Sequence, residues 1–339
     1  MRNLFLPLTL LLLLGAGCFS LESETTADSD TGEQTQVVTE PSSVTGEPTE
    51  PPTGEPPDQQ ESGIQNHALF IAFSDDGDTW DVNEETIAEE ASVGNLMALT
   101  QDAGEYEAGD LLAYFVDASE MAKIGEERIG LISSTDNGKT WSERQKIVIN
   151  DLPDTILTVD PTAVQLDDGS IRIFFFDFSQ VGGVAQEDWD EDQDHVILSA
   201  ISTDGETFDF EGESFRRVNV TDPEVVKFGD MWFMYLAAMA EDGIAIATSV
   251  DGQSFEDTGI VINMEGIPGS LVVDDEVQIF GCSRTGITRA SSTDGTTFSE
   301  EEIALQVPAC DPDPAILADG SIALLFKGFS TTLTMPPAQ

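Results

Sequence analysis

The sequence is poor in basic residues, histidine and cysteine. It has 13 Lys and Arg against 65 Asp and Glu, and its formal net charge is −52. Nucleic acids and anionic membrane surfaces are therefore poor partners, because they repel a chain this acidic. The acidity has two explanations: a solvated surface suited to high salt, where charge is screened, or a surface that collects cations or basic partners. The two histidines, His67 and His195, are too scattered to indicate a zinc site or a Ser-His-Asp triad.

The N-terminus has the pattern of an export signal. One basic residue, Arg2, precedes the apolar run LFLPLTLLLLLGAG, which is too short for a comfortable membrane span. The run ends at Cys18, and LLGAGC resembles a bacterial lipoprotein signal, with Gly15 where that family usually has Leu. The resemblance implies that residues 1–17 are removed and that Cys18 is lipidated, with ordinary secretion as the alternative. We therefore expect a bacterial cell-envelope protein that contacts the membrane only through its lipid.

Residues 18–65 are rich in Thr, Glu and Pro and contain no Lys or Arg. They cannot bury enough apolar surface to offset the entropy of ordering, so we expect a disordered, acidic tether. The following residues, 66–335, are long enough for one large domain with its own core, expected to be monomeric. Cys282 and Cys310 lie in this part, and in an exported protein they form either a disulfide or two buried thiols.

A short Asp-rich turn recurs five times in this domain, at residues 74–80, 134–141, 202–208, 249–255 and 292–298. Its Ser and Asp side chains can bond local backbone N–H groups, its Gly suits a turn, and its Trp or Phe can anchor the turn to a sheet. Between the turns are short apolar runs such as LLAYFVDAS, IRIFFFDFS and MWFMYLAAM. These runs predict β-strands, because they are brief and bounded by turn residues.

The repeat predicts an all-β fold, a five-bladed β-propeller with four-stranded antiparallel blades. Four units are complete. The chain after Cys310 supplies only the first two strands of a fifth, and HALFIAFSDDGDTWDVNEETIAEE, near the start of the domain, supplies the other two. We expect these N-terminal strands to complete the last blade, which leaves no open sheet edge.

The turns match the Asp-box pattern S-x-D-x-G-x-T-W or its form one residue shorter. They resemble the turns of sialidases and other propellers with bacterial neuraminidase repeats, and the resemblance covers the folded part as architecture. Sialidase chemistry would also need an arginine triad and a Tyr nucleophile, but nothing in the spacing of the arginines assembles such a triad. The arginines considered are Arg128, Arg172, Arg284 and Arg289. We therefore expect a likeness to sialidases in fold but not in activity.

Candidate site residues lie at the starts of the first strands. If the Asp-rich turns occupy one face, these starts and the loops between second and third strands occupy the opposite face, around the channel. Three starts read Asp-Pro, at Asp160, Asp222 and Asp311, and the fourth offers Glu265. The proline predicts an extended conformation for each Asp, and Glu224 and Asp313 are expected on the same strand faces. A ring of carboxylates would push their pKa values apart, as a general acid and base require.

This constellation resembles five-bladed glycoside hydrolases of the arabinanase, β-xylosidase and invertase kind. Asp160, Asp222 and Glu265 match that family's base, pKa-tuning Asp and acid in type and order, and Asp311 would be an extra carboxylate of the pocket. The resemblance implies an inverting hydrolase that requires no cofactor, or a glycan binder on the same scaffold. Two departures support a non-catalytic protein-interaction propeller instead: the preceding blade starts with SVGNLMAL, which lacks Asp, and Asp311 repeats the motif as if Asp-Pro only started strands.

One loop of the second blade, AQEDWDEDQDH, suggests a calcium site. Its alternating carboxylates are Asp188, Asp190, Asp192 and Asp194. Hard oxygen ligands in a flexible loop suit calcium, although the spacing is not that of an EF-hand. The alternatives are a solvated acidic loop, or a sugar-stacking role for Trp189.

Overall fold

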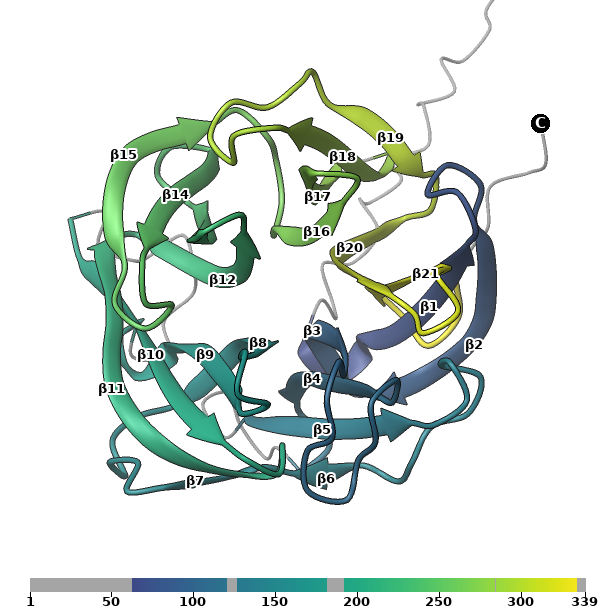
Figure 1. Ribbon diagram of the computed structural model, residues 1–339, viewed down its shortest axis with the longest axis horizontal. Coiled ribbons are helices and arrows are strands. Elements are labelled where there is room, and N and C mark those ends of the chain that lie inside the picture. The colour runs from purple at the N-terminus through teal and green to yellow at the C-terminus, as the bar shows by residue number, and fades with distance from the viewer. Residues whose placement is uncertain (1–62, 121–126, 182–191, 284, 334–339) are drawn as a thin grey trace, which may run out of the picture. The chain divides into compact units, whose positions relative to one another are not determined.

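The computed structural model describes residues 63–120, 127–181, 192–283 and 285–333. These residues form five β-sheets arranged as blades around a central channel, so the predicted five-bladed propeller is confirmed (Figure 1). Within the described ranges helix is limited to the short η1 (Ile64–Asn66) and η2 (Phe178–Val181), and no helix is long and apolar enough to span a membrane. The signal, Cys18 and almost all of the tether lie outside these ranges and stay predictions.

Each blade is an antiparallel sheet whose first strand lies at the channel. The first blade contains β3 (Ala91–Ala98), β4 (Leu111–Asp117), β5 (Arg128–Ser134) and β6 (Gln145–Lys146). The second contains β8 (Thr158–Gln165), β9 (Ile171–Asp177), β10 (Asp194–Ser202) and β11 (Thr207–Val218). The third contains β12 (Val220–Phe228), β13 (Met231–Ala238), β14 (Gly243–Ser249) and β15 (Glu256–Ile262). The fourth contains β16 (Gly269–Val273), β17 (Glu276–Ser283), β18 (Gly286–Ser292) and β19 (Glu302–Leu305).

The fifth blade joins the two ends of the described chain. Its strands lie in the order β2 (Asp81–Glu89), β1 (Ala68–Ser74), β21 (Ile322–Gly328) and β20 (Ala309–Ile316), as the sequence predicts. One detail differs from the prediction. The stretch 145–150, which follows the second Asp-rich turn and would be the last strand of a four-stranded first blade, is divided, because β7 (Val148–Asn150) leaves that blade and pairs in parallel with β11 of the second. The second sheet therefore has five strands, and this segment links two neighbouring blades.

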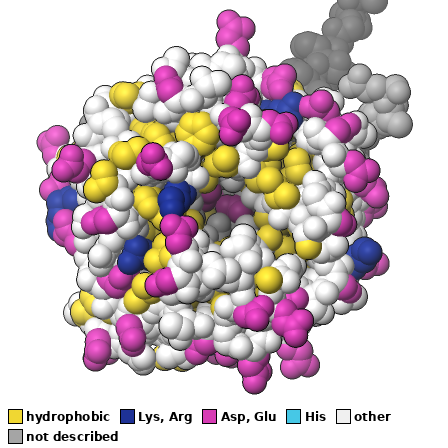
Figure 2. All heavy atoms as spheres, viewed as in Figure 1, with side chains coloured by type: hydrophobic (Ala, Val, Ile, Leu, Met, Phe, Trp, Pro, Cys, Tyr) yellow, Lys and Arg dark blue, Asp and Glu magenta, His cyan; other side chains and the backbone are white. Residues whose placement is uncertain are grey.

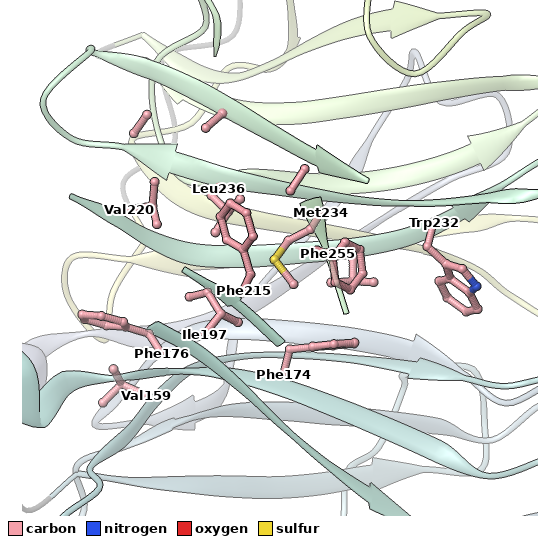
Figure 3. Close-up of a cluster of buried hydrophobic side chains, with 14 of the residues drawn as sticks. Val159, Phe174, Phe176, Ile197, Phe215, Val220, Trp232, Met234, Leu236 and Phe255 are labelled. Carbon is pink, nitrogen blue, oxygen red and sulfur yellow. The ribbon is translucent and has the colours of Figure 1, made fainter. Parts of the chain in front are cut away.

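The hydrophobic core lies between the blades. Its buried residues form five clusters, each between two adjacent sheets. Along β1, for example, Phe70 packs toward the fourth blade, whereas Leu69 and Ile71 pack toward the first. Figure 3 shows the cluster between the second and third blades, where Phe174 and Met234 lie among the buried side chains. Because both faces of an inner strand are covered, these strands appear in the sequence as almost continuous apolar runs.

The five Asp-rich turns all join the third strand of a blade to the fourth. In the turn after β10, the Gly205 N–H donates to Ser202 Oγ (2.9 Å) and the Thr207 N–H donates to Asp204 Oδ1 (2.7 Å). The same two bonds form in the other four turns, and the glycine φ angles lie between 68° and 78°. The repeated residues therefore serve to satisfy the backbone of the turn.

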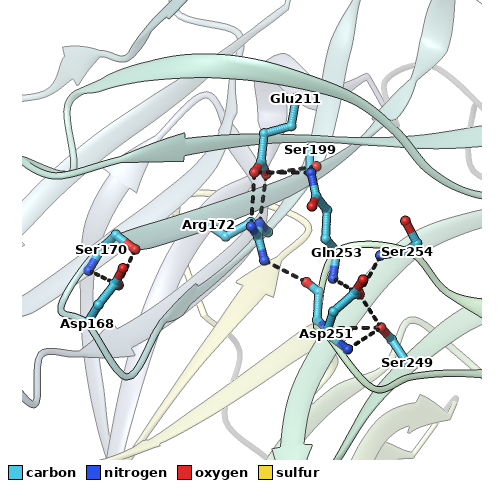
Figure 4. Close-up of polar contacts among 10 residues, drawn as sticks. Asp168, Ser170, Arg172, Ser199, Glu211, Ser249, Asp251, Gln253 and Ser254 are labelled. Atoms are coloured by element: carbon cyan, nitrogen blue, oxygen red, sulfur yellow. Dashed lines mark hydrogen bonds and ion pairs between the residues drawn. The ribbon is translucent and has the colours of Figure 1, made fainter.

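The turns also connect neighbouring blades. Tyr114 Oη of the first blade donates to the Gly205 carbonyl of the second (2.8 Å), and Tyr235 Oη of the third donates to the Gly295 carbonyl of the fourth (3.0 Å). Arg172 makes the equivalent bond from the second blade to the third (Figure 4). The carbonyl of the turn glycine thus accepts a hydrogen bond from the preceding blade. The repeated turns therefore hold neighbouring blades together on the face opposite the strand starts.

Candidate functional site

The strand starts around the channel are bulged. Asp160, Asp222 and Asp311 have left-handed φ angles of 53°, 50° and 51°, and the pairing of first and second strands shifts register beside each. The prediction of an extended Asp is therefore wrong, because Asp tolerates this backbone and the bulge re-aims its side chain. Val93 at the start of the first blade has the same conformation, with a φ of 41°. Because Val93 adopts the same left-handed conformation without a carboxylate, the strand start does not require Asp. The presence of Asp at the other three positions therefore needs a different explanation.

A cavity of about 580 Å³, here called the large cavity, lies at this end of the channel. Asp160 of β8, Asp222 of β12 and Glu265, just before β16, all contribute to its lining. Much of the remaining wall is apolar, with Phe176 and Phe178 from the second blade prominent. The structure thus brings three candidate residues from successive blades together on the face that the sequence indicates. A cavity of this size and character is suited to a small organic ligand.

Asp311 lies elsewhere. It is absent from the lining of the large cavity and lines a small cavity of about 10 Å³ further along the channel, together with Asp222 and Glu224. Its Oδ2 atom accepts a hydrogen bond from the Val93 N–H (3.3 Å) and lies 2.6 Å from Lys327 Nζ. The expectation that Asp311 is an extra carboxylate of the same pocket is therefore not met, because this ion pair holds its carboxylate behind the site.

Burial and mutual repulsion shape the charge of the two aspartates that line the large cavity. Burial, followed by the negative charges of Asp222 and Asp311, raises the pKa of Asp160 well above its usual range. Burial is also the largest cause that raises the pKa of Asp222 to about 6, while Lys327 acts in the opposite direction. The two carboxyls therefore bind a proton more tightly than free aspartates do.

A polar hub, consisting of Asn95, Thr162, Glu224, Ser270 and Asp313, ties the five first strands together. Glu224 accepts hydrogen bonds from Thr162 Oγ1 (3.0 Å) and Ser270 Oγ (2.6 Å). Asp313 is bonded to Glu224 and to Asn95 Nδ2 (3.2 Å). Each blade contributes one member, so the hub fixes the spacing of the strands that carry the site. The centre of the ring is hollowed in Figure 2, and acidic side chains are visible inside it.

The hub predicts a dependence of stability on pH. Burial raises the pKa of Glu224 from 4.5 to about 7. Because this folded-state pKa exceeds the unfolded value, the folded protein binds the proton more tightly and loses stability as the pH rises from about 5 to 7.5. We expect Glu224→Gln to remove up to about 1.4 kcal/mol per pH unit from this slope. Denaturant unfolding at several pH values measures it, with Glu256→Gln, at an exposed position, as the control. If stability changed with pH in the same way in the parent, Glu224→Gln and Glu256→Gln, the assignment of this pH dependence to Glu224 would be contradicted.

Glu265 is positioned by a tight turn against β17. The Cys282 N–H donates to the Glu265 carbonyl (3.2 Å). Gly266 has a φ of 98°, and a Cβ atom there would collide with Cys282, so only glycine fits. A disulfide joins Cys282 to Cys310 of β20, with the Cα atoms 5.1 Å apart. It connects β17, against which the turn with Glu265 lies, to the strand that carries Asp311 in the next blade.

We expect removal of this disulfide to cost about 3.5 kcal/mol of unfolding free energy, because it closes a loop of 28 residues. The Cys282→Ala/Cys310→Ala protein should unfold at a lower denaturant concentration than the oxidised protein, and reductant should reproduce that shift. The double variant itself is the control, because reductant should leave its unfolding midpoint unchanged. A midpoint equal to that of the oxidised protein would contradict a stabilising role.

Three titratable residues of the large cavity were not predicted: Glu127, Asp242 and His67. Glu127 and Asp242 lie in loops between second and third strands. The propeller geometry places these loops on the ligand face, so both residues could have been named from the sequence. His67 precedes β1. Burial, and then the charge of Lys327, lower the pKa of His67 to about 4, so its ring is neutral at pH 7.

Among the residues that the structure describes, no Lys or Arg lines the large cavity. Arg172 pairs with Glu211, Arg289 pairs with Asp78 and Glu302, and Arg284 lies outside the described residues. The described arginines therefore assemble no triad for a carboxylate-bearing sugar.

The predicted calcium loop falls mostly outside the described residues, which exclude Asp188, Trp189 and Asp190. Asp192 is exposed, and Asp194 begins β10. Within the described ranges no group of three or more His, Cys, Asp or Glu side chains is arranged to hold a metal ion. The calcium site and the stacking role of Trp189 remain predictions.

Comparisons with known proteins agree with the fold. No protein-family model and no curated protein sequence matches the chain. The exo-beta-1,3-galactanase of Phanerochaete chrysosporium, solved with galactose, aligns with a TM-score of 0.50 and 11% identity over 73% of this chain and 63% of that chain. The alpha-L-arabinanase of Penicillium chrysogenum aligns with a TM-score of 0.46 and 14% identity over 76% of this chain and 85% of that chain. A Hadza microbial sialidase aligns with a TM-score of 0.45 and 14% identity over 64% of this chain and 48% of that chain.

The galactanase alignment shows the fold alone, because its sequence identity is low and this chain spans less than two thirds of that protein. The predicted likeness to five-bladed glycoside hydrolases is confirmed at this level. The chain is a propeller of the architecture found in carbohydrate-active enzymes, with a carboxylate-lined cavity where its first strands begin.

Proposed function

We propose that this protein is a cell-envelope propeller, anchored by a lipid on Cys18, that binds uncharged glycans in the large cavity and hydrolyses a glycosidic bond there. The observation that carries the proposal is the convergence of Asp160, Asp222 and Glu265 on one cavity. The galactose bound to the galactanase supports a sugar as the ligand.

The three carboxyl groups can supply both proton transfers of a hydrolysis. One carboxyl protonates the departing oxygen, and one carboxylate accepts a proton from the water that attacks the anomeric carbon. The family resemblance assigns Asp160 as base, Asp222 as the residue that tunes its pKa and Glu265 as acid. Burial is the largest cause that raises the pKa of both Asp160 and Asp222, so either aspartate can be the one that carries a proton. The dependence of the rate on the leaving group distinguishes these assignments.

The charge of the cavity limits the class of sugar that can bind there. Its described lining includes five carboxyl groups and no Lys or Arg; the carboxyls are Glu127, Asp160, Asp222, Asp242 and Glu265. A sugar that carries a carboxylate would be repelled by them, whereas a neutral sugar can hydrogen-bond to the carboxylates and pack on the apolar wall. Neutral arabinosides, xylosides, galactosides or fructosides are therefore the proposed class.

The proposal is tested by incubating the full chain with aryl arabinofuranoside, xyloside, galactoside, fructofuranoside-type and sialoside substrates, at low and molar salt. We expect hydrolysis of at least one neutral glycoside and none of the sialoside. Binding of neutral oligosaccharides without turnover would reject the hydrolase and support a glycan-binding propeller. A folded protein that neither binds nor cleaves any of them would support the protein-interaction alternative.

A further inference from the structure

Lys327 is a buried cation directly behind the candidate site. It lies on β21, is 8% exposed, and places Nζ 2.6 Å from Asp311 Oδ2, whose side chain is 1% exposed. The same ammonium lies over the ring of Phe329, 5.3 Å from its centroid. In the part of the chain that the structure describes, neither the large nor the small cavity has a Lys or Arg in its lining. A positive charge in this position therefore acts on a group of otherwise acidic neighbours.

The groups around this ion pair come from several blades. His67 precedes β1, Asp160 lies on β8, and Asp222 lies on β12. Glu127, which precedes β5, acts on Asp160. The negative charge of Asp311 favours protonation of Asp160 and Asp222, and the positive charge of Lys327 opposes it. The two members of the ion pair therefore act in opposite directions on the same two carboxyls.

Two features show that this pair is built into the fold. Asp311 also accepts the N–H of Val93, so it joins the fifth blade to the first. Its second oxygen, Oδ1, is buried and has no hydrogen-bond partner among the described residues. A buried carboxylate with an unpartnered oxygen is costly unless a cation lies beside it, and Lys327 is that cation.

We propose that Lys327 is a positioning residue of the site, which, through its ion pair with Asp311, limits the Asp160–Asp222 pair to one proton at neutral pH. Lys327 contacts no ligand in this arrangement. It compensates Asp311, which lines the small cavity together with Asp222, so that one carboxyl of the Asp160–Asp222 pair remains ionised while the other holds the proton. The inference deepens the proposed function, because hydrolysis needs one ionised and one protonated carboxyl in the same cavity.

The test combines Lys327→Met, Asp311→Asn, the double variant and Lys327→Arg. The first readout is the acid limb of the pH profile of kcat/KM for the full chain on a neutral aryl glycoside. Lys327→Met should move this limb up by about one pH unit or more, a tenfold loss at mildly acidic pH, and Asp311→Asn should move it down. The double variant should return close to the original limb, because the two opposing charges leave together. Lys327→Arg should retain it.

The second readout does not depend on activity. The carbon-13 shifts of labelled Asp carboxyl groups report the protonation of Asp160 and Asp222 directly, and the same order of shifts is expected among the variants. If the protein cleaves nothing, the proposed function fails while this titration still decides the inference. Unchanged titration in folded Lys327→Met overturns it. If Lys327→Met does not fold, the other variants decide. A titration of the aspartate pair in the double variant that differs from the parent by more than about one pH unit overturns the inference. A downward shift of that titration in Asp311→Asn, with the double variant close to the parent, supports the inference.

Discussion

Glu265→Gln should lower kcat about 1,000-fold for glycosides with poor leaving groups and change it little for 2,4-dinitrophenyl glycosides. A general acid contributes about 10²- to 10⁴-fold, and a leaving group that departs as a stable anion does not need its proton. The side chain keeps its size, so binding and folding should be preserved. Steady-state kinetics on a series of aryl glycosides measures the effect, and Glu256→Gln, at an exposed position, is the matched control.

The same series assigns the other roles. If Asp160 is the base, Asp160→Asn should be slow on every leaving group, and azide should restore turnover because it attacks without losing a proton. If instead the proton on Asp160 is the one delivered, Asp160→Asn should show the leaving-group dependence described for Glu265→Gln. Equal activity of both variants and the parent on all substrates would contradict a catalytic role for the large cavity.

Arg172→Met should destabilise the propeller by about 3 to 5 kcal/mol, a fall of roughly 10 °C in Tm. Arg172 donates to both carboxylate oxygens of Glu211, at 2.7 and 2.9 Å, and to the Gly252 carbonyl at 3.0 Å (Figure 4). Its side chain is 8% exposed and that of Glu211 is 14% exposed. The variant leaves a largely buried carboxylate without its cation and removes the link to the turn of the next blade. Denaturant unfolding measures the loss.

The nearby pair Arg216–Glu213 provides the control. Its side chains are 46% and 48% exposed, so Arg216→Met should cost less than about 1 kcal/mol. Arg172→Met/Glu211→Met should recover much of the lost stability, because both buried charges are then absent. Losses of the same size for Arg172→Met and Arg216→Met would show that the buried pair is not needed to join the blades.

The fold could be predicted from the sequence because its signals are local and repeated. Five Asp-rich turns at matching positions mark the blades, and the run that contains β1 has the pattern of third and fourth strands without the first two. The division of the last strand of the first blade was not predictable. Residues 145–150 form one short polar and apolar stretch, and only packing against β11 decides where β7 pairs.

The site was predicted in part. Asp160, Asp222 and Glu265 could be named because their positions recur at the strand starts. Their backbone conformation could not, since the rule for residues before proline favours extended structure whereas the observed bulge is set by pairing with the second strand.

Asp311 and Lys327 show what a repeat cannot reveal. The Asp-Pro motif makes Asp311 look equivalent to Asp160 and Asp222, but a lysine on the neighbouring strand holds it outside the large cavity. The signal was a lone Lys inside the apolar run IALLFKGF. Its partner depends on the register of β20 and β21, where Lys327 lies opposite Cys310, and register is a property of the folded sheet.

The most direct test of the account is a crystal structure of Glu265→Gln soaked with the neutral oligosaccharide that the protein binds or cleaves best. We predict a sugar ring in the large cavity, with hydroxyl groups hydrogen-bonded to Asp160 or Asp222 and one face of the ring against Phe176 or Phe178. A sugar bound on the face of the Asp-rich turns, with the large cavity empty at a concentration that saturates binding in solution, would contradict the account.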